Sequence, residues 1–174
     1  MRKSPTGSPG PASSRNAYPV PRQMPPRLYE RLILSLVENE DWFGLVWRDD
    51  GSFSRRAKGF WTGLKMLQID RQRVHHWPGT RSAGLATVIR YETSRRALSS
   101  LLSVDSFFAW IKPDRPEDLF FGSGDSDLAY VSVTHEMDAW LLRRRYASLI
   151  AQEVTLTRET WSREDYAFFQ GYLR

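Results

Sequence analysis

The sequence predicts an α/β or α+β domain: a single mixed sheet ending in an antiparallel meander, with helices packed on it and a disordered N-terminal tail. Three observations predict this class. Apolar residues recur at helical spacing in several segments of the chain. Short aromatic and β-branched runs, bounded by Gly, Pro and Asp, fill residues 107–133. Pro, Gly and Ser dominate the first 26 residues, and the remaining 27–174 are enough for one buried core.

The N-terminal segment 1–26 holds seven of the ten prolines and four basic residues, with no acid. A segment with so few large apolar residues cannot bury enough surface to offset the entropy lost on ordering. We therefore expect a flexible basic tail, followed by a single globular domain over 27–174.

The first half of the domain is expected to alternate helices and strands. The clearest helix has apolar residues at positions 28, 29, 32, 33, 36 and 37, which form one stripe. Residues 70–84 show no periodicity, and long internal loops are often functional. In chain order we expect a helix over 27–40, a strand over 42–48, a helix over 54–68, an irregular loop over 70–84, a strand over 85–91 and a helix over 95–104.

The second half is expected to form the meander. Gly122-Ser123-Gly124-Asp125 supplies the residues that a tight hairpin turn needs. Ser162 and Asp165 have the spacing of a capping box at the start of a last helix. We expect strands over 107–111, 119–121 and 128–133, a helix over 136–151, an edge strand over 153–157 and a final helix after Ser162.

Residues 115–140 resemble part of a group of small bacterial proteins. The corner Arg115-Pro116-Glu117-Asp118-Leu119-Phe120-Phe121 is followed by a hairpin and by a strand running into His135-Glu136-x-x-Ala139-Trp140. This pattern looks like the C-terminal half of small bacterial proteins that mostly lack an assigned activity. The resemblance is confined to this stretch and implies a bacterial α/β protein. The resemblance implies no catalytic residue in this chain.

Composition excludes several functional classes. There is no cysteine, so disulfides, thiolate zinc sites and a cysteine nucleophile are absent. No apolar run approaches the roughly 18 residues that a membrane span needs, and the N-terminus has no apolar signal-peptide region. We therefore expect a cytoplasmic protein that does not enter a membrane. No glycine-rich phosphate loop or metal-ligand set emerges, so we expect no cofactor and no metal.

One constellation could carry catalysis. His135 could act as a general base oriented by Glu117 or Asp118, with Glu136 beside it. The alternative is that Thr134 caps a helix and the acids complement its positive end. The H-E-x-x-H zinc pattern is missing because position 139 is Ala. An enzyme is therefore the less favoured reading.

The charge distribution predicts an anion-binding surface in the middle of the chain. Residues 55–96 hold ten basic residues against Asp70 and Glu92, whereas 105–138 hold eight acids against Lys112 and Arg115. Basic residues interleaved with aromatic rings are typical of single-stranded nucleic-acid binding. Phe60 and Trp61 fall on an apolar helical stripe, however, and the acidic segment could neutralise the basic one. The candidate residues for anion or nucleic-acid binding are Arg71, Arg73, His75, His76, Trp77, Arg81, Arg95 and Arg96.

Two functions follow from these patterns. The leading expectation is a non-enzymatic protein-interaction module, with immunity or inhibitor proteins as one form, because seven tryptophans exceed what such a domain normally buries. The alternative is a nucleic-acid-binding accessory protein that uses the basic tail and the 55–96 segment. Basic residues gathered on one face would favour nucleic acid, and basic residues interdigitated with acids would favour a protein partner.

Overall fold

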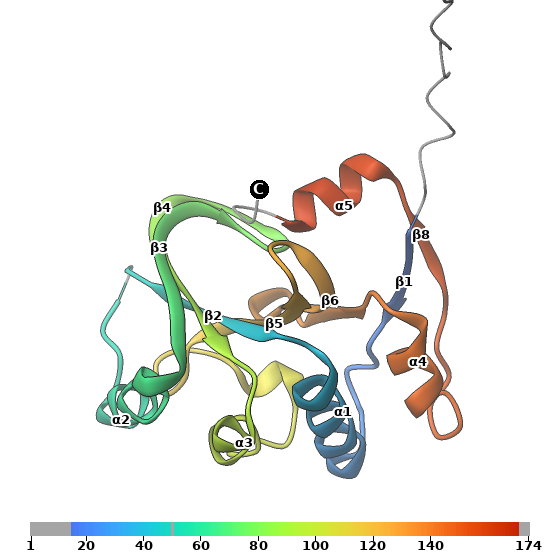
Figure 1. The fold of residues 1–174 in the computed structure, drawn as a ribbon. Coiled ribbons are helices and arrows are strands. Elements are labelled where there is room, and N and C mark those ends of the chain that lie inside the picture. Colours follow the sequence, from blue (N-terminus) through green and yellow to red (C-terminus); the bar gives the residue numbers. More distant parts are fainter. Residues whose placement is uncertain (1–14, 50, 171–174) are drawn as a thin grey trace, which may run out of the picture.

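The computed structural model describes residues 15–49 and 51–170, which form one eight-stranded sheet in the order β3-β4-β2-β5-β6-β7-β1-β8 (Figure 1). The expected α/β fold class is confirmed, and every described strand pair is antiparallel. The strands are β1 (Arg15–Pro19), β2 (Trp42–Arg48), β3 (Gln68–Trp77), β4 (Thr80–Glu92), β5 (Glu117–Ser123), β6 (Asp127–Val133), β7 (Asp138–Leu141) and β8 (Glu159–Trp161).

Helices cover the sheet unequally. The helices α1 to α4 lie along one face of the sheet, and α5 lies on the opposite side, towards which β3 and β4 arch over the sheet (Figure 1). No helix in the described ranges is long and apolar enough to span a membrane. The helices are α1 (Pro26–Asn39), α2 (Arg55–Leu64), α3 (Arg95–Leu101), α4 (Arg144–Ile150) and α5 (Arg163–Gln170), and the 3₁₀ turns are η1 (Lys65–Leu67), η2 (Phe107–Ala109) and η3 (Thr134–Glu136).

The sheet separates two apolar cores. Alternate residues of β2 point to opposite faces, so Phe43, Leu45 and Trp47 pack towards the helices while Trp42 and Val46 pack on the α5 side. A central strand covered on both faces reads as a continuous apolar run, which explains the sequence WFGLVW. The six apolar residues of the α1 stripe are all buried, as expected.

The segment 70–84, expected to be an irregular loop, instead forms most of the β3–β4 hairpin, so that expectation was wrong. Two register shifts, between Gln68 and Asp70 and between Val74 and His76, break the two-residue alternation that marks a strand. The turn is Pro78-Gly79, and Gly79 has φ +75°, which fits the glycine position of a type II turn. Its backbone sits so close to Phe169 that a Cβ would lie 2.9 Å from the ring.

The N-terminal tail ends earlier than expected. Residues 15–26 were assigned to the disordered tail, but Arg15–Pro19 pairs with β7 on one side and β8 on the other. Ala17 and Val20 are buried, so this short stretch contributes to the core despite its prolines. The remaining tail residues, 1–14, lie outside the described residues.

Three further expectations in the second half were wrong. No strand forms over 107–111, because residues 107–109 form the 3₁₀ turn η2, where the Ser106 hydroxyl accepts a hydrogen bond from the Phe108 amide at 3.2 Å. The helix expected over 136–151 is split, because Met137 takes φ 58° and returns the chain as β7, antiparallel to β6. The helical part, α4, begins only at Arg144. The last strand lies at Glu159–Trp161 rather than over 153–157.

Candidate functional site

The eight candidate anion-binding residues fall in three places. Arg71 and Arg73 are exposed on β3, near α2. Arg95 and Arg96 are exposed in the first turn of α3. The others, His75, His76, Trp77 and Arg81, lie at the far end of the β3–β4 hairpin, where β3 and β4 meet α5. The structure therefore does not gather them into one surface.

The end of the β3–β4 hairpin packs against other parts of the protein. Trp77 is fully buried, and its indole N–H donates to Asp118 Oδ2 at 2.7 Å. His76 Nε2 lies 2.9 Å from the Phe168 carbonyl of α5. A buried ring cannot stack on a nucleic-acid base, so the expected stacking role of Trp77 is wrong for this conformation. His75 and Arg81 remain exposed.

A hollow of about 420 Å³ opens where α2, the end of β2 and the middle of β3 meet. Three aromatic rings line it: Trp47 lies 4.9 Å from Phe53 and 5.6 Å from Trp61 between ring centroids. Arg48, Lys58 and Arg71 add positive charge to the same wall, and Asp49 adds the only acid among the described lining residues. We call this hollow, together with the one described next, the Trp61 cleft.

A second hollow of about 430 Å³ adjoins the first and shares Trp61 and Arg71 with it. Thr62, Lys65 and Gln68 complete its wall. The Arg71 guanidinium carbon lies 5.3 Å from the Trp61 ring centroid, within the range of a cation–π contact. The Trp61 ring is thus half-buried between the two hollows, and basic residues line both of them.

The basic residues of 55–96 are largely free of internal neutralisation. Within the described chain, only Arg73, 2.5 Å from Asp49, and Arg90, 3.3 Å from Asp70, form ion pairs among these ten residues. Acids of 105–138 pair instead with basic residues outside 55–96, such as Asp127 with Arg15 and Arg143. The expected neutralisation of the basic segment by the acidic one is therefore not seen in the described ion pairs.

The structure brings the catalytic candidates Glu117 and His135 together with Asp118. Ligand atoms of the three side chains all lie within 4.8 Å of one another. Burial raises the pKa of Asp118, and hydrogen bonds from the Thr134 amide and the Trp77 indole partly offset that rise. Glu136 is more exposed, and its carboxylate lies 3.7 Å from His135 Nε2.

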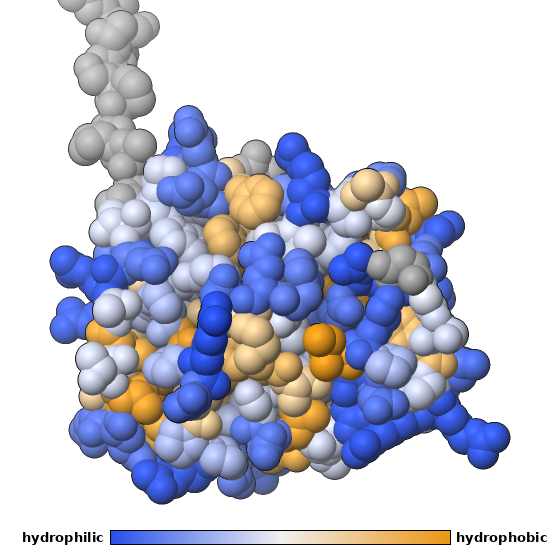
Figure 2. Space-filling view, turned by 180° about the vertical axis from the view of Figure 1, so that it is seen from behind, coloured by the Kyte–Doolittle hydropathy of each residue, from blue (hydrophilic) through white to orange (hydrophobic). Residues whose placement is uncertain are grey.

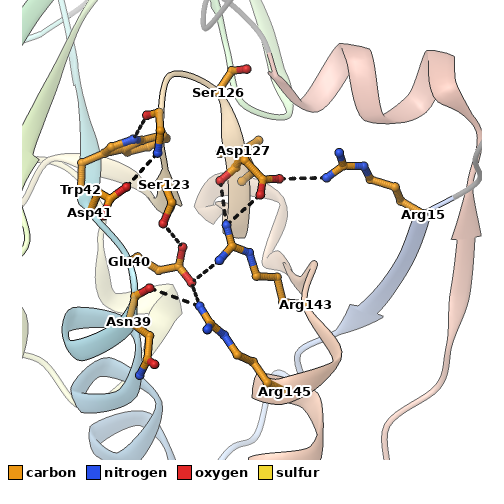
Figure 3. Close-up of polar contacts among 12 residues, drawn as sticks. Arg15, Asn39, Glu40, Asp41, Trp42, Ser123, Ser126, Asp127, Arg143 and Arg145 are labelled. Atoms are coloured by element: carbon orange, nitrogen blue, oxygen red, sulfur yellow. Dashed lines mark hydrogen bonds and ion pairs between the residues drawn. The ribbon is translucent and has the colours of Figure 1, made fainter.

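A second polar cluster, which the sequence patterns did not indicate, surrounds Glu40 at the end of α1 (Figure 3). The Glu40 side chain is fully buried and accepts hydrogen bonds from Arg143 at 3.0 Å, from Ser123 at 2.8 Å, and from Arg145 and Tyr146. Every carboxylate oxygen is satisfied from within the protein. The arrangement therefore joins α1, β5 and α4 rather than offering a binding site.

No protein-family model matches this chain, and neither curated proteins nor solved structures gave a match.

Proposed function

We propose that the protein binds single-stranded nucleic acid through the Trp61 cleft. The observation that carries the proposal is the contact of Arg71 with the Trp61 ring at 5.3 Å, where the two hollows adjoin. Lys58, Lys65 and Arg71 form no ion pair within the described chain. Nonspecific single-strand binding combines a basic groove with rings on which bases stack. Both parts meet here on one surface.

The size and charge of the cleft support this ligand class. Each hollow has the volume of a small-ligand pocket, and the two adjoin along Trp61. Lys58, Lys65 and Arg71 can each neutralise one phosphate, while Asp49 is occupied by its ion pair with Arg73. In the view of Figure 2, hydrophilic side chains cover the lower right of the molecule, the side on which α2 lies.

Fluorescence anisotropy with a labelled ten-nucleotide oligothymidine at low salt tests the proposal. Trp61→Ala is expected to weaken binding by about 5- to 150-fold, which corresponds to the roughly 1–3 kcal/mol of one stacked base. Trp140→Ala is the matched control, because Trp140 is also half-buried but lies on β7, across the sheet from the cleft. Equal binding by wild type and Trp61→Ala, or equal weakening by both variants, would refute the proposal.

A protein partner is the second candidate function, and one observation favours it. β3 is an edge strand of ten residues, and two large apolar side chains are exposed on it or just before it: Ile69 on β3 at 56% and Met66 of η1 at 89%. An open edge can accept a strand from another protein, as an immunity- or inhibitor-type module could use it. The tryptophan count no longer supports this function, because Trp42, Trp47, Trp77, Trp110 and Trp161 are buried in the cores.

Affinity capture with nuclease present separates the two candidates. Ile69→Lys would abolish capture of a protein partner and leave oligonucleotide binding intact. Loss of oligonucleotide binding with unchanged capture would assign the surface to nucleic acid alone.

A further inference from the structure

We propose that Glu117, Asp118 and His135 form a site for one divalent transition-metal ion, and that Zn²⁺ is a suitable occupant. This replaces the expectation of no metal site, and it is independent of the proposed nucleic-acid function. The two carboxylates come from the start of β5, and the imidazole comes from η3, directly after β6. One ligand atom from each residue lies within 4.8 Å of the other two.

The backbone explains how two consecutive residues serve one site. Side chains at neighbouring strand positions normally point to opposite faces of the sheet. Asp118 has φ 50°, in the left-handed region that non-glycine residues seldom adopt, and this breaks the alternation between Glu117 and Asp118. Both carboxylates therefore reach the same side, close to His135.

Glu117 is an incompletely satisfied buried group. The residue is 4% exposed, and its Oε2 atom is buried with no hydrogen-bond partner. Its ion-pair partner in the described part of the chain is Arg48, whose Nη1 lies 3.6 Å from Oε2, beyond hydrogen-bonding distance. Buried carboxylates are normally paired, hydrogen-bonded or bound to a metal. Two adjacent buried carboxylates beside a single guanidinium leave a place for further positive charge.

The surroundings of Asp118 are those of an oriented metal ligand. Its Oδ1 accepts the Thr134 amide and its Oδ2 accepts the Trp77 indole N–H, both at 2.7 Å. Such hydrogen bonds hold a ligating carboxylate in place and leave further lone pairs for an ion. The His135 side chain is 36% exposed, which gives an ion a path from solvent and leaves room for a bound water.

The donor set selects the kind of ion. One imidazole nitrogen with two carboxylate oxygens is a three-ligand combination that zinc accepts, with water in a fourth position. Mg²⁺ and Ca²⁺ prefer oxygen ligands alone. We therefore expect Zn²⁺ to bind and Mg²⁺ not to compete at equal concentration.

Isothermal titration of ZnCl₂ into the full chain tests the site, with no polyhistidine tag and after removal of bound metal by a chelator. Wild type is expected to bind one ion per chain at pH 7, and Zn²⁺ should raise its melting temperature. His135→Ala should weaken binding at least tenfold and lose that rise, while circular dichroism stays unchanged because the side chain is partly exposed. His75→Ala is the matched control, because His75 is an exposed histidine outside the cluster.

Three outcomes would overturn the site. They are the absence of saturable binding by wild type, wild-type affinity in His135→Ala, and loss of binding in His75→Ala. Glu117→Gln adds an independent check, since it removes a charge without changing the size of the side chain. It should also weaken Zn²⁺ binding, and undiminished affinity in a folded Glu117→Gln protein would count against the site.

Discussion

Replacing Glu40 with Gln should destabilise the fold strongly. The Glu40 carboxylate is fully buried and accepts hydrogen bonds from two arginines, a tyrosine and a serine (Figure 3). Glutamine keeps the volume, but it removes the negative charge and places an amide N–H₂ where only an acceptor fits. Arg143 and Arg145 would then face a neutral group.

The expected magnitude is about 2–3 kcal/mol. Breaking a fully buried ion pair costs about 3–5 kcal/mol. Here the Arg143 and Arg145 side chains are 24% and 45% exposed, so water can hydrate them partly after the substitution. The Tyr146 hydroxyl, which donates to Glu40, is in a buried contact and adds the cost of a weakened hydrogen bond.

Urea unfolding measures this change directly. At an m value near 2 kcal/mol per molar, the Glu40→Gln midpoint should fall by about 1–1.5 M with no change in slope. Asp138→Asn is the control, because the exposed Asp138–Arg22 pair at 3.3 Å should contribute less than about 1 kcal/mol. A Glu40→Gln midpoint within 0.2 M of wild type, a margin of roughly 0.4 kcal/mol at that slope, would refute the structural role of the cluster.

Three further predictions concern the fold. Gly44→Ala should cost about 1–3 kcal/mol in urea unfolding, because its Cβ would lie 2.2 Å from a buried ring, whereas Gly59→Ala, with no atom within 4 Å, should be neutral or stabilising. Deleting 1–25 should lower the melting temperature well below that of a chain lacking only 1–14, since β1 bridges β7 and β8; equal values would contradict that role. Hydrogen bonds from Arg27 and Arg31 of α1 lower the pKa of Glu153. The ionised Glu153 therefore stabilises the fold above its unfolded pKa of about 4.3, and this stabilisation is lost as the pH falls through the lower folded value. The melting-temperature gap between wild type and Glu153→Gln should therefore be seen at pH 7 and close as the pH falls below about 4.3, and a gap that widens in acid would show the sign to be wrong.

Local sequence patterns predicted the parts of the fold that local interactions determine. The α1 stripe is buried as its spacing indicated. The capping box at α5 forms, with the Ser162 amide donating to Asp165 at 2.8 Å and the Asp165 amide donating to Ser162 at 3.1 Å. Hydrogen bonding from the Ser162 side chain, and then from the Ser162 amide, lowers the pKa of Asp165, because both favour the ionised carboxylate. These elements depend on neighbours within a few residues.

The β3–β4 hairpin could not be predicted in the same way. Its outer strand is polar because it lies at the sheet edge, and its register shifts hide the alternation. The Pro78-Gly79 turn was the available signal, because this dipeptide favours a two-residue turn. Burial of Trp77 depends on the hairpin reaching Asp118, a residue 41 positions along the chain.

The candidate sites, like the fold, could be predicted only in part from the sequence. The sequence indicated a basic middle segment that includes Arg71, but it placed Trp61 on an inward helical face. Trp61 lies at the margin of that face, half-buried, because the hollows on either side are formed by β3 and by residues 51–53. The sequence indicated that Glu117 or Asp118 would lie near His135, whereas the approach of both carboxylates depends on a backbone angle that no pattern encodes.

The salt dependence of oligonucleotide binding tests the nucleic-acid proposal most directly. Binding that neutralises phosphates weakens with salt, and log K falls by about 0.7 per single-strand phosphate contact for each unit of log[salt]. The double variant Lys58→Gln/Arg71→Gln should reduce that slope by about 1.4, while Trp61→Ala should weaken binding at an unchanged slope. An unchanged slope in the double variant, together with full affinity in Trp61→Ala, would show that nucleic acid does not bind in the Trp61 cleft.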